Sequence, residues 1–213
     1  LIYFMPSIPK QESFAFRVAL HSYRVILTTP AFIKFTATAF CCFIPLFAWL
    51  VDGPFIVMQT YHQTPLFFGL MQATIFAGYM VGMRFTKRFI RKWHVKKVLR
   101  FGFLVVAASA MLFMCCGWFD FGLEVAVASF TGISLGTAIV SGPLNRLAVE
   151  SSAEPTVQKV AIYSNAIGFA AVVASFLVVL TCARHMLISL AWISLMAIAL
   201  GITCFRLLPG KVE

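Results

Sequence analysis

The side chains that could make specific contacts inside a membrane in this chain are neutral and polar. They are Gln72, Thr74, Tyr79, Ser134, Asn145, Ser164 and Asn165, each within or at the end of a long apolar stretch. Such groups could line a wide apolar cavity for lipophilic molecules, together with the aromatic residues Phe43, Phe47, Trp49 and Phe76. The alternative is that they form hydrogen bonds between packed helices, which explains most Ser, Thr and Asn residues in membrane helices.

Groups that could carry out catalysis are missing from the apolar stretches. The four histidines, His21, His62, His94 and His185, lie in predicted loops or at helix ends, and no Asp or Glu lies in the central part of an apolar stretch. The six cysteines lack the CxxC spacing of a metal site. We therefore expect neither an enzyme, nor a metal site, nor an organic cofactor.

The composition identifies an integral membrane protein. Of 213 residues, 61% are hydrophobic and 11% are charged, and the mean hydropathy is +0.93. A water-soluble domain of this size could not bury that much apolar surface. The net charge of +10 would suggest nucleic acid in a soluble protein, but here membrane topology explains it and no nucleic-acid partner is expected.

The basic segment 84–100, which we expect to form a short loop between two spans, sets the orientation of the chain. It carries Arg84, Lys87, Arg88, Arg91, Lys92, Lys96, Lys97 and Arg100 and contains no Asp or Glu. Short segments rich in Lys and Arg stay in the cytoplasm. The segment 55–65 has no Lys or Arg, as expected on the external side.

Alternation then predicts six transmembrane helices with both ends cytoplasmic. The expected spans are 31–51, 66–85, 98–118, 123–149, 157–182 and 186–208, each long enough to cross a bilayer core of roughly 30 Å. Asp52-Gly53-Pro54 is expected to end the first span. Residues 1–30 are interpreted as the end of a preceding helix, at Leu1–Pro6, plus a cytoplasmic linker, and 209–213 as a tail. We therefore expect the later part of a longer polypeptide.

Small residues predict close helix packing in two spans. Gly78 and Gly82 form a GxxxG pair, and the stretch 132–145 is rich in Gly, Ser and Thr. The second and fifth spans, both rich in glycine and polar residues, occupy matching places in two three-helix units. This pattern is typical of the inverted three-plus-three repeats of transporter halves.

Three stretches resemble the second half of the major facilitator superfamily. They are PLFAWLVDGP at 45–54, FGLMQATIFAG at 68–78 ahead of the basic segment, and 132–146 with its Asn-Arg ending. Among its members they look most like the Bcr/CflA and MdfA-type drug/proton antiporters. The resemblance implies an all-α fold in which these six helices form the second bundle of a twelve-helix transporter working by alternating access. It also implies the bacterial inner membrane, a lipophilic substrate, a separate or linked N-terminal six-helix half, and the proton gradient in place of a cofactor.

The resemblance places Trp49, Gln72, Phe76 and Arg146 in or beside the central cavity, to which the residue types add Phe47, Asn145 and Asn165. Arg146 could pair with Glu150 or the backbone, or could contact a ligand, and packing or gating is the simpler interpretation. The resemblance makes the basic segment a cytoplasmic latch, formed by Arg84, Lys87, Arg88, Arg91, Lys96 and Lys97. The segment departs from the family pattern because it contains no carboxylate. The proton-carrying acids are expected in the other half.

Other functions remain open at this point. The chain could belong to a transporter of one metabolite, such as a sugar, an amino acid or a siderophore. It could also be a regulatory or other non-transporting six-helix membrane protein. A membrane-embedded enzyme is disfavoured because buried reactive groups are missing.

Overall fold

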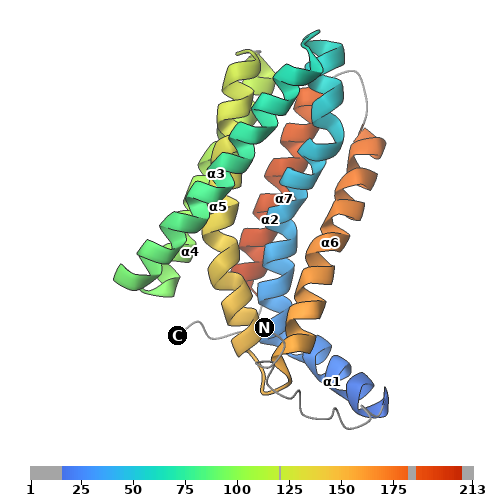
Figure 1. The fold of residues 1–213 in the computed structure, drawn as a ribbon, viewed down its shortest axis with the longest axis vertical. Coiled ribbons are helices and arrows are strands. Elements are labelled where there is room, and N and C mark those ends of the chain that lie inside the picture. Colours follow the sequence, from blue (N-terminus) through green and yellow to red (C-terminus); the bar gives the residue numbers. More distant parts are fainter. Residues whose placement is uncertain (1–15, 120, 182–185, 208–213) are drawn as a thin grey trace, which may run out of the picture.

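The structure is a computed structural model that describes residues 16–119, 121–181 and 186–207, which form helices and short connections without a strand (Figure 1). The helices are α1 (Phe16–Thr28), α2 (Pro30–Phe55), the π-helix η1 (Ile56–Thr60), α3 (Pro65–Lys92), α4 (Val95–Phe119), α5 (Leu123–Glu150), α6 (Thr156–Thr181) and α7 (Met186–Leu207). Six of them, α2 to α7, are long and apolar enough to cross a membrane. The predicted all-α polytopic membrane fold is thus confirmed.

Local sequence explains where two of the spans begin. Proline occupies the first turn of α2 and of α3, where its missing N–H and fixed φ suit a helix start. Before α3, the Thr64 hydroxyl accepts a hydrogen bond of 3.3 Å from the Phe67 N–H, so it caps one of the donors that every helix start leaves free. The N-terminal ends of these spans therefore lie within one residue of the predicted positions.

The predicted end of the first span is wrong. Asp52-Gly53-Pro54 does not stop α2, which runs to Phe55 and continues as η1 to Thr60. Proline and glycine are tolerated in membrane helices because neighbouring helices compensate for the weakened backbone bonding. Ile56 and Val57, both fully buried, gain apolar packing that favours continuation of the helix. Asp52 consequently lies inside the span.

The basic segment is helical and not a loop, which also differs from the expectation. Helix α3 runs to Lys92 and α4 begins at Val95, so only Trp93 and His94 connect them. Part of the predicted linker 1–30 likewise forms a helix, α1. The predicted helix end at Leu1–Pro6, the turn at 182–185 and the tail 209–213 lie outside the described residues.

The six membrane helices fall into two three-helix units along the chain, α2–α4 and α5–α7, and the first helix of each unit packs on the second and third helices of the other. Helix α2 packs on α6 and α7, and α5 packs on α3 and α4, while α2 also packs on α5 and α4 on α7. The buried share of the apolar window is 56%, 22% and 39% in α2, α3 and α4, and it is again 56%, 22% and 39% in α5, α6 and α7. The first helix of each unit is therefore the inner one, and both units have the same internal order of burial.

Close contact between α3 and α5 depends on glycine, as predicted. A Cβ atom added at Gly82 would lie 2.5 Å from the Leu135 carbonyl oxygen and 2.8 Å from the Ala138 Cβ, and one at Gly78 would lie 2.7 Å from the Thr131 Cγ2. Neither position leaves room for a side chain. The GxxxG pair thus lets the two backbones approach each other.

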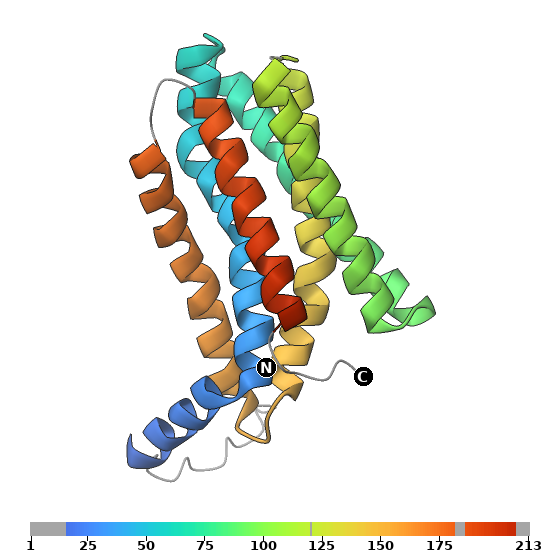
Figure 2. The same ribbon diagram turned by 180° about the vertical axis from the view of Figure 1, so that it is seen from behind.

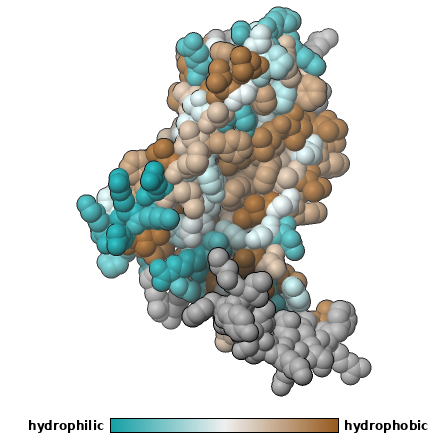
Figure 3. All heavy atoms as spheres, in the orientation of Figure 1, coloured by the Kyte–Doolittle hydropathy of each residue, from teal (hydrophilic) through white to brown (hydrophobic). Residues whose placement is uncertain are grey.

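Positive charge gathers at one end of the bundle, here called the basic end. This is where α3 ends, α4 begins and α7 ends, and Figure 3 shows its hydrophilic side chains projecting from the α3–α4 hairpin beside a largely apolar surface. Every described Lys and Arg lies in the half of the molecule at this end. Such an asymmetry is typical of membrane proteins whose basic end faces the cytoplasm.

Candidate functional site

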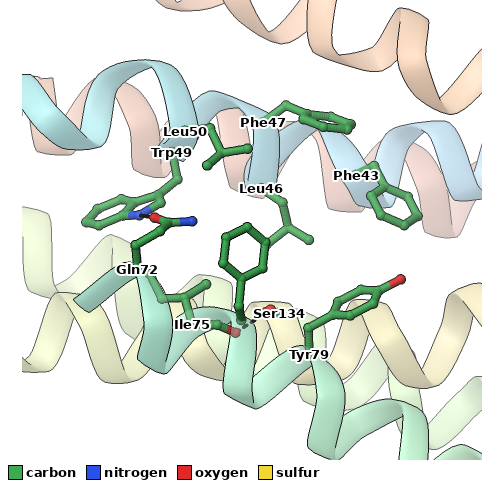
Figure 4. A pocket seen from close by; sticks show the side chains of 10 residues that line it. Phe43, Leu46, Phe47, Trp49, Leu50, Gln72, Ile75, Tyr79 and Ser134 are labelled. Atoms are coloured by element: carbon green, nitrogen blue, oxygen red, sulfur yellow. Dashed lines mark hydrogen bonds between the residues drawn. The ribbon is translucent and has the colours of Figure 1, made fainter. Parts of the chain in front are cut away.

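An apolar pocket lies between α2 and α3, with a volume of about 260 Å³. It is lined by Phe43, Leu46, Phe47, Trp49, Leu50, Gln72, Ile75, Phe76, Tyr79 and Ser134 (Figure 4). Along α3 the lining extends between about 10 and 21 Å from the first residue, at 1.5 Å per residue. The pocket therefore lies near the middle of a span, at a depth where lipophilic molecules partition.

Helical spacing brings these side chains to one face of each helix. On α2 the lining residues include Phe43, Leu46, Phe47 and Leu50, and on α3 they are Gln72, Ile75, Phe76 and Tyr79. Both sets follow the i, i+3, i+4, i+7 pattern of one helix face. The two faces meet across the pocket, and Ser134 of α5 closes it from behind.

The polar centre of the pocket is a hydrogen bond between two of the predicted site residues. The Trp49 indole N–H donates to the Gln72 side-chain oxygen at 3.0 Å (dashed line in Figure 4). Trp49 is almost fully buried and its ring lies 4.6 Å from that of Phe130. Because an indole nitrogen can only donate, the amide must turn its oxygen toward Trp49. The Gln72 amide N–H groups remain as donors, and no described residue accepts from them.

The hydroxyl groups around the pocket mainly join helices. The Ser134 hydroxyl donates to the Ile75 carbonyl at 2.9 Å, which links α5 to α3. The Tyr79 and Ser141 hydroxyls lie 3.4 Å apart, and Thr74 bonds to the Leu70 carbonyl of its own helix. The helix-packing interpretation therefore holds for Ser134 and Tyr79, whereas Thr74 is exposed and bonds only within its own helix. Gln72 remains the side chain with free hydrogen-bonding capacity at the pocket.

Four of the seven predicted cavity residues come together and three do not. Phe47, Trp49, Gln72 and Phe76 all line the pocket. Asn145, Arg146 and Asn165 lie outside it and are exposed. Arg146 pairs with Glu150 at 2.7 Å, one helical turn away, as one of the two interpretations expected. This exposed i,i+4 pair contributes only a few tenths of a kcal/mol, on the order of 0.3–0.5.

Phe43, Tyr79 and Ser134, which the sequence suggested as possible cavity wall, also line the pocket, whereas three lining residues were not predicted, namely Leu46, Leu50 and Ile75. The signal that could have found them is the shared spacing of the two helix faces. Starting from Phe43 and Tyr79, steps of three and four residues reach Leu46, Leu50 and Ile75. Composition alone does not separate these from other apolar residues of the spans.

The predicted latch residues lie on two helices, with Arg84, Lys87, Arg88 and Arg91 on α3 and Lys96 and Lys97 on α4. All six are exposed, and none forms a salt bridge with a described carboxylate. An aromatic cluster holds the hairpin together instead. The rings of Phe89 and Trp93 stack at 4.8 Å, and Phe101 packs edge-on against Phe89 at 5.7 Å.

Among the described acids, Asp52 of α2 is the one whose side chain is buried. It is 5% exposed and forms no salt bridge with a described residue. By helical register it lies three turns beyond Cys41, which borders α7 at Gly201, so it lies on the α7 side of α2 and away from the pocket. Within the described ranges, no three His, Cys, Asp or Glu side chains gather closely enough to hold a metal ion.

In comparisons with known proteins, neither a family model nor a curated protein matches the chain. The class of protein follows from the fold itself. The chain is a multi-pass helical membrane protein with six transmembrane helices.

Proposed function

We propose that the chain is the C-terminal six-helix bundle of a secondary transporter of the major facilitator type. The whole transporter would export lipophilic molecules in exchange for protons. The observation that carries the proposal is the repeated arrangement of the two three-helix units α2–α4 and α5–α7, with a pocket between α2 and α3 that Ser134 of α5 closes from behind. Because the first unit has three spans, the second unit begins on the opposite side of the membrane from the first and is inverted relative to it. Inverted repeats with a site near the midplane are typical of transporters that work by alternating access.

The pocket lining favours a lipophilic substrate with a hydrogen-bond acceptor. Nine of the ten lining positions offer aromatic, aliphatic or already bonded groups, and Gln72 offers amide donors. A sugar or amino acid would leave several of its polar groups without partners against such a wall. This favours multidrug export over the transport of one hydrophilic metabolite. The basic end would face the cytoplasm of a bacterial inner membrane, with the exposed Asn145, Arg146 and Asn165 bordering the space between the two halves.

Export of a fluorescent lipophilic dye by cells that produce the native gene product tests this proposal. Gln72→Leu removes the amide donors and Phe76→Ala removes an exposed pocket ring, so both should abolish most of the export. Phe176→Ala is the matched control, since Phe176 is a similarly exposed phenylalanine of α6 outside the pocket. Equal export by all variants would refute the pocket assignment.

Loss of uptake of a sugar or amino acid, with dye export unaffected, would support a metabolite transporter. The absence of any transport would support a non-transporting protein.

Asp52 is the candidate proton-binding group in this half, because an ionisable group inside a membrane span is costly and is usually kept for function. Among the helices that pack on α2, the described charge at the same end as Asp52 is the exposed Glu124, and the other described charges, on α1, α3, α5, α6 and α7, lie at the basic end. We expect Asp52→Asn to retain dye binding but to lose export driven by a pH gradient. Unchanged gradient-driven export would place the coupling acids in the other half, as the sequence resemblance implied.

A further inference from the structure

A second hollow lies on the opposite side of the bundle from the pocket and shares no residue with it. It is a groove between α4 and α7, two helices that lie side by side in Figure 2, and its volume is about 570 Å³. It is lined by Arg100, Phe103, Leu104, Ala107, Ile202, Phe205 and Arg206. Both helices are only partly buried in the bundle, at 39% of their apolar windows. The groove therefore opens to the lipid.

The groove is charged at one end and apolar along the rest. Arg100 lies in the second turn of α4 and Arg206 in the last turn of α7, so both cations are at the basic end. The apolar lining continues away from them, and Ala107 lies about 10 Å further along α4 than Arg100. This polarity matches a phospholipid, whose headgroup lies at the membrane interface and whose chains extend inward.

The aromatic floor of the groove has a third cation behind it. The rings of Phe103 and Phe205 pack at 5.3 Å, and the Lys34 ammonium lies 5.0 Å from the centre of the Phe205 ring. Lys34 is 6% exposed, so its charge is buried close to the groove.

No described carboxylate balances the two arginines of the groove. Among the described acids, Asp52 and Glu124 lie toward the opposite end of the bundle, Glu150 pairs with Arg146, and Glu154, between α5 and α6, neither lines the groove nor forms a salt bridge with a described residue. Arg100 and Arg206 have no salt bridge to a described residue. A guanidinium group binds a phosphate oxygen pair in a fixed, bidentate geometry. Two such groups beside one groove form a site for a phosphate that lacks its own positive charge.

We propose that this groove binds an anionic phospholipid such as phosphatidylglycerol. Arg100 and Arg206 hold the headgroup phosphate, and an acyl chain lies along Leu104, Ala107 and Ile202. A zwitterionic lipid fits less well, because its ammonium group would lie beside the two arginines. The site is independent of the transport proposal, since it shares no residue with the pocket.

Native mass spectrometry of the full native gene product in non-ionic detergent tests the site by titration with phosphatidylglycerol or phosphatidylcholine. We expect one phosphatidylglycerol to be retained preferentially. The double variant Arg100→Gln/Arg206→Gln should weaken that binding by about tenfold or more. Ala107→Phe should also weaken it, without any change of charge, by filling the groove. The control Arg88→Gln/Arg91→Gln removes the same charge from α3 outside the groove and should bind as the unmodified protein does.

Three results would overturn the proposal. Equal weakening in the Arg88/Arg91 control would mean diffuse attraction to the basic end. Equal retention of phosphatidylcholine would mean that headgroup charge is not recognised. Unchanged binding in both the arginine double variant and Ala107→Phe would place the lipid elsewhere. Far-UV circular dichroism of each variant separates loss of lipid from loss of fold.

Discussion

At the residue scale, a hydrogen bond between Trp49 and Gln72 fixes the positions of both side chains. The indole is almost fully buried, and the Gln72 oxygen is its hydrogen-bond acceptor at 3.0 Å. Removing the acceptor alone leaves a buried donor without a partner, which costs about 1–3 kcal/mol. Removing donor and acceptor together avoids that cost. The effects of the two substitutions should therefore not be additive.

This predicts a measurable coupling in a double-mutant cycle. Gln72→Leu should destabilise the protein by about 1–3 kcal/mol in the presence of Trp49 but by much less in a Trp49→Phe background. The free energy of unfolding can be measured by far-UV circular dichroism during titration with sodium dodecyl sulfate in mixed micelles. A coupling energy near zero would mean that the hydrogen bond adds nothing to stability, and that Gln72 is free to rotate into the pocket.

At the scale of helices, α3 and α5 touch through glycine, and one exposed glycine offers a matched comparison. Gly82→Ala would place a methyl group against the Leu135 carbonyl and the Ala138 side chain, so we expect a loss of about 1–3 kcal/mol by overpacking. A Cβ at Gly69 of the same helix would meet nothing within 4 Å. Gly69→Ala should be neutral or stabilising by up to about 1 kcal/mol, since alanine favours the helix. Similar unfolding curves for both variants would show that the helices can separate at little cost.

The helices were largely predictable from the sequence, and the exceptions have physical causes. Apolar length located all six spans because a bilayer core demands it. The first span was cut short because Gly53-Pro54 would end a helix in water but not one whose next turn, with Ile56 and Val57, is buried. The basic segment was taken for a loop because charge was expected to mark the end of a span, whereas α3 continues beyond the apolar region to Lys92.

The pocket was only half predictable, because its formation depends on which helix faces meet. Gln72 and Trp49 were expected at a cavity, but nothing in the sequence pairs one with the other across 23 positions. Asn145 and Asn165 have the same kind of side chain as Gln72, yet their positions on α5 and α6 leave them exposed and outside the pocket. Residue type indicates which side chains can form a site, and helix packing decides which of them do.

At the scale of the whole molecule, the pocket is open on the face that α2 and α3 present. Phe76 and Leu50 line it and are 51% and 41% exposed. If lipid covered this face, the Gln72 amide donors would lie in hydrocarbon without partners, which is unfavourable. A second bundle that encloses a water-containing cavity removes that cost. The pocket therefore favours a functional unit in which another set of helices faces this one.

The mass of the native gene product tests that expectation. An antibody against the basic segment 84–100 should detect a polypeptide of roughly twice the 23.6 kDa of this chain, as two six-helix halves require. The product could instead have a mass of 23.6 kDa and crosslink to a second bundle through cysteines introduced at Phe47 or Phe76. This result would also agree with a second bundle facing the pocket, and another chain would then supply that bundle. A product of that mass that crosslinks to nothing through the pocket face would contradict it. The protein would then expose Gln72 to lipid, and the pocket would not be half of a transport cavity.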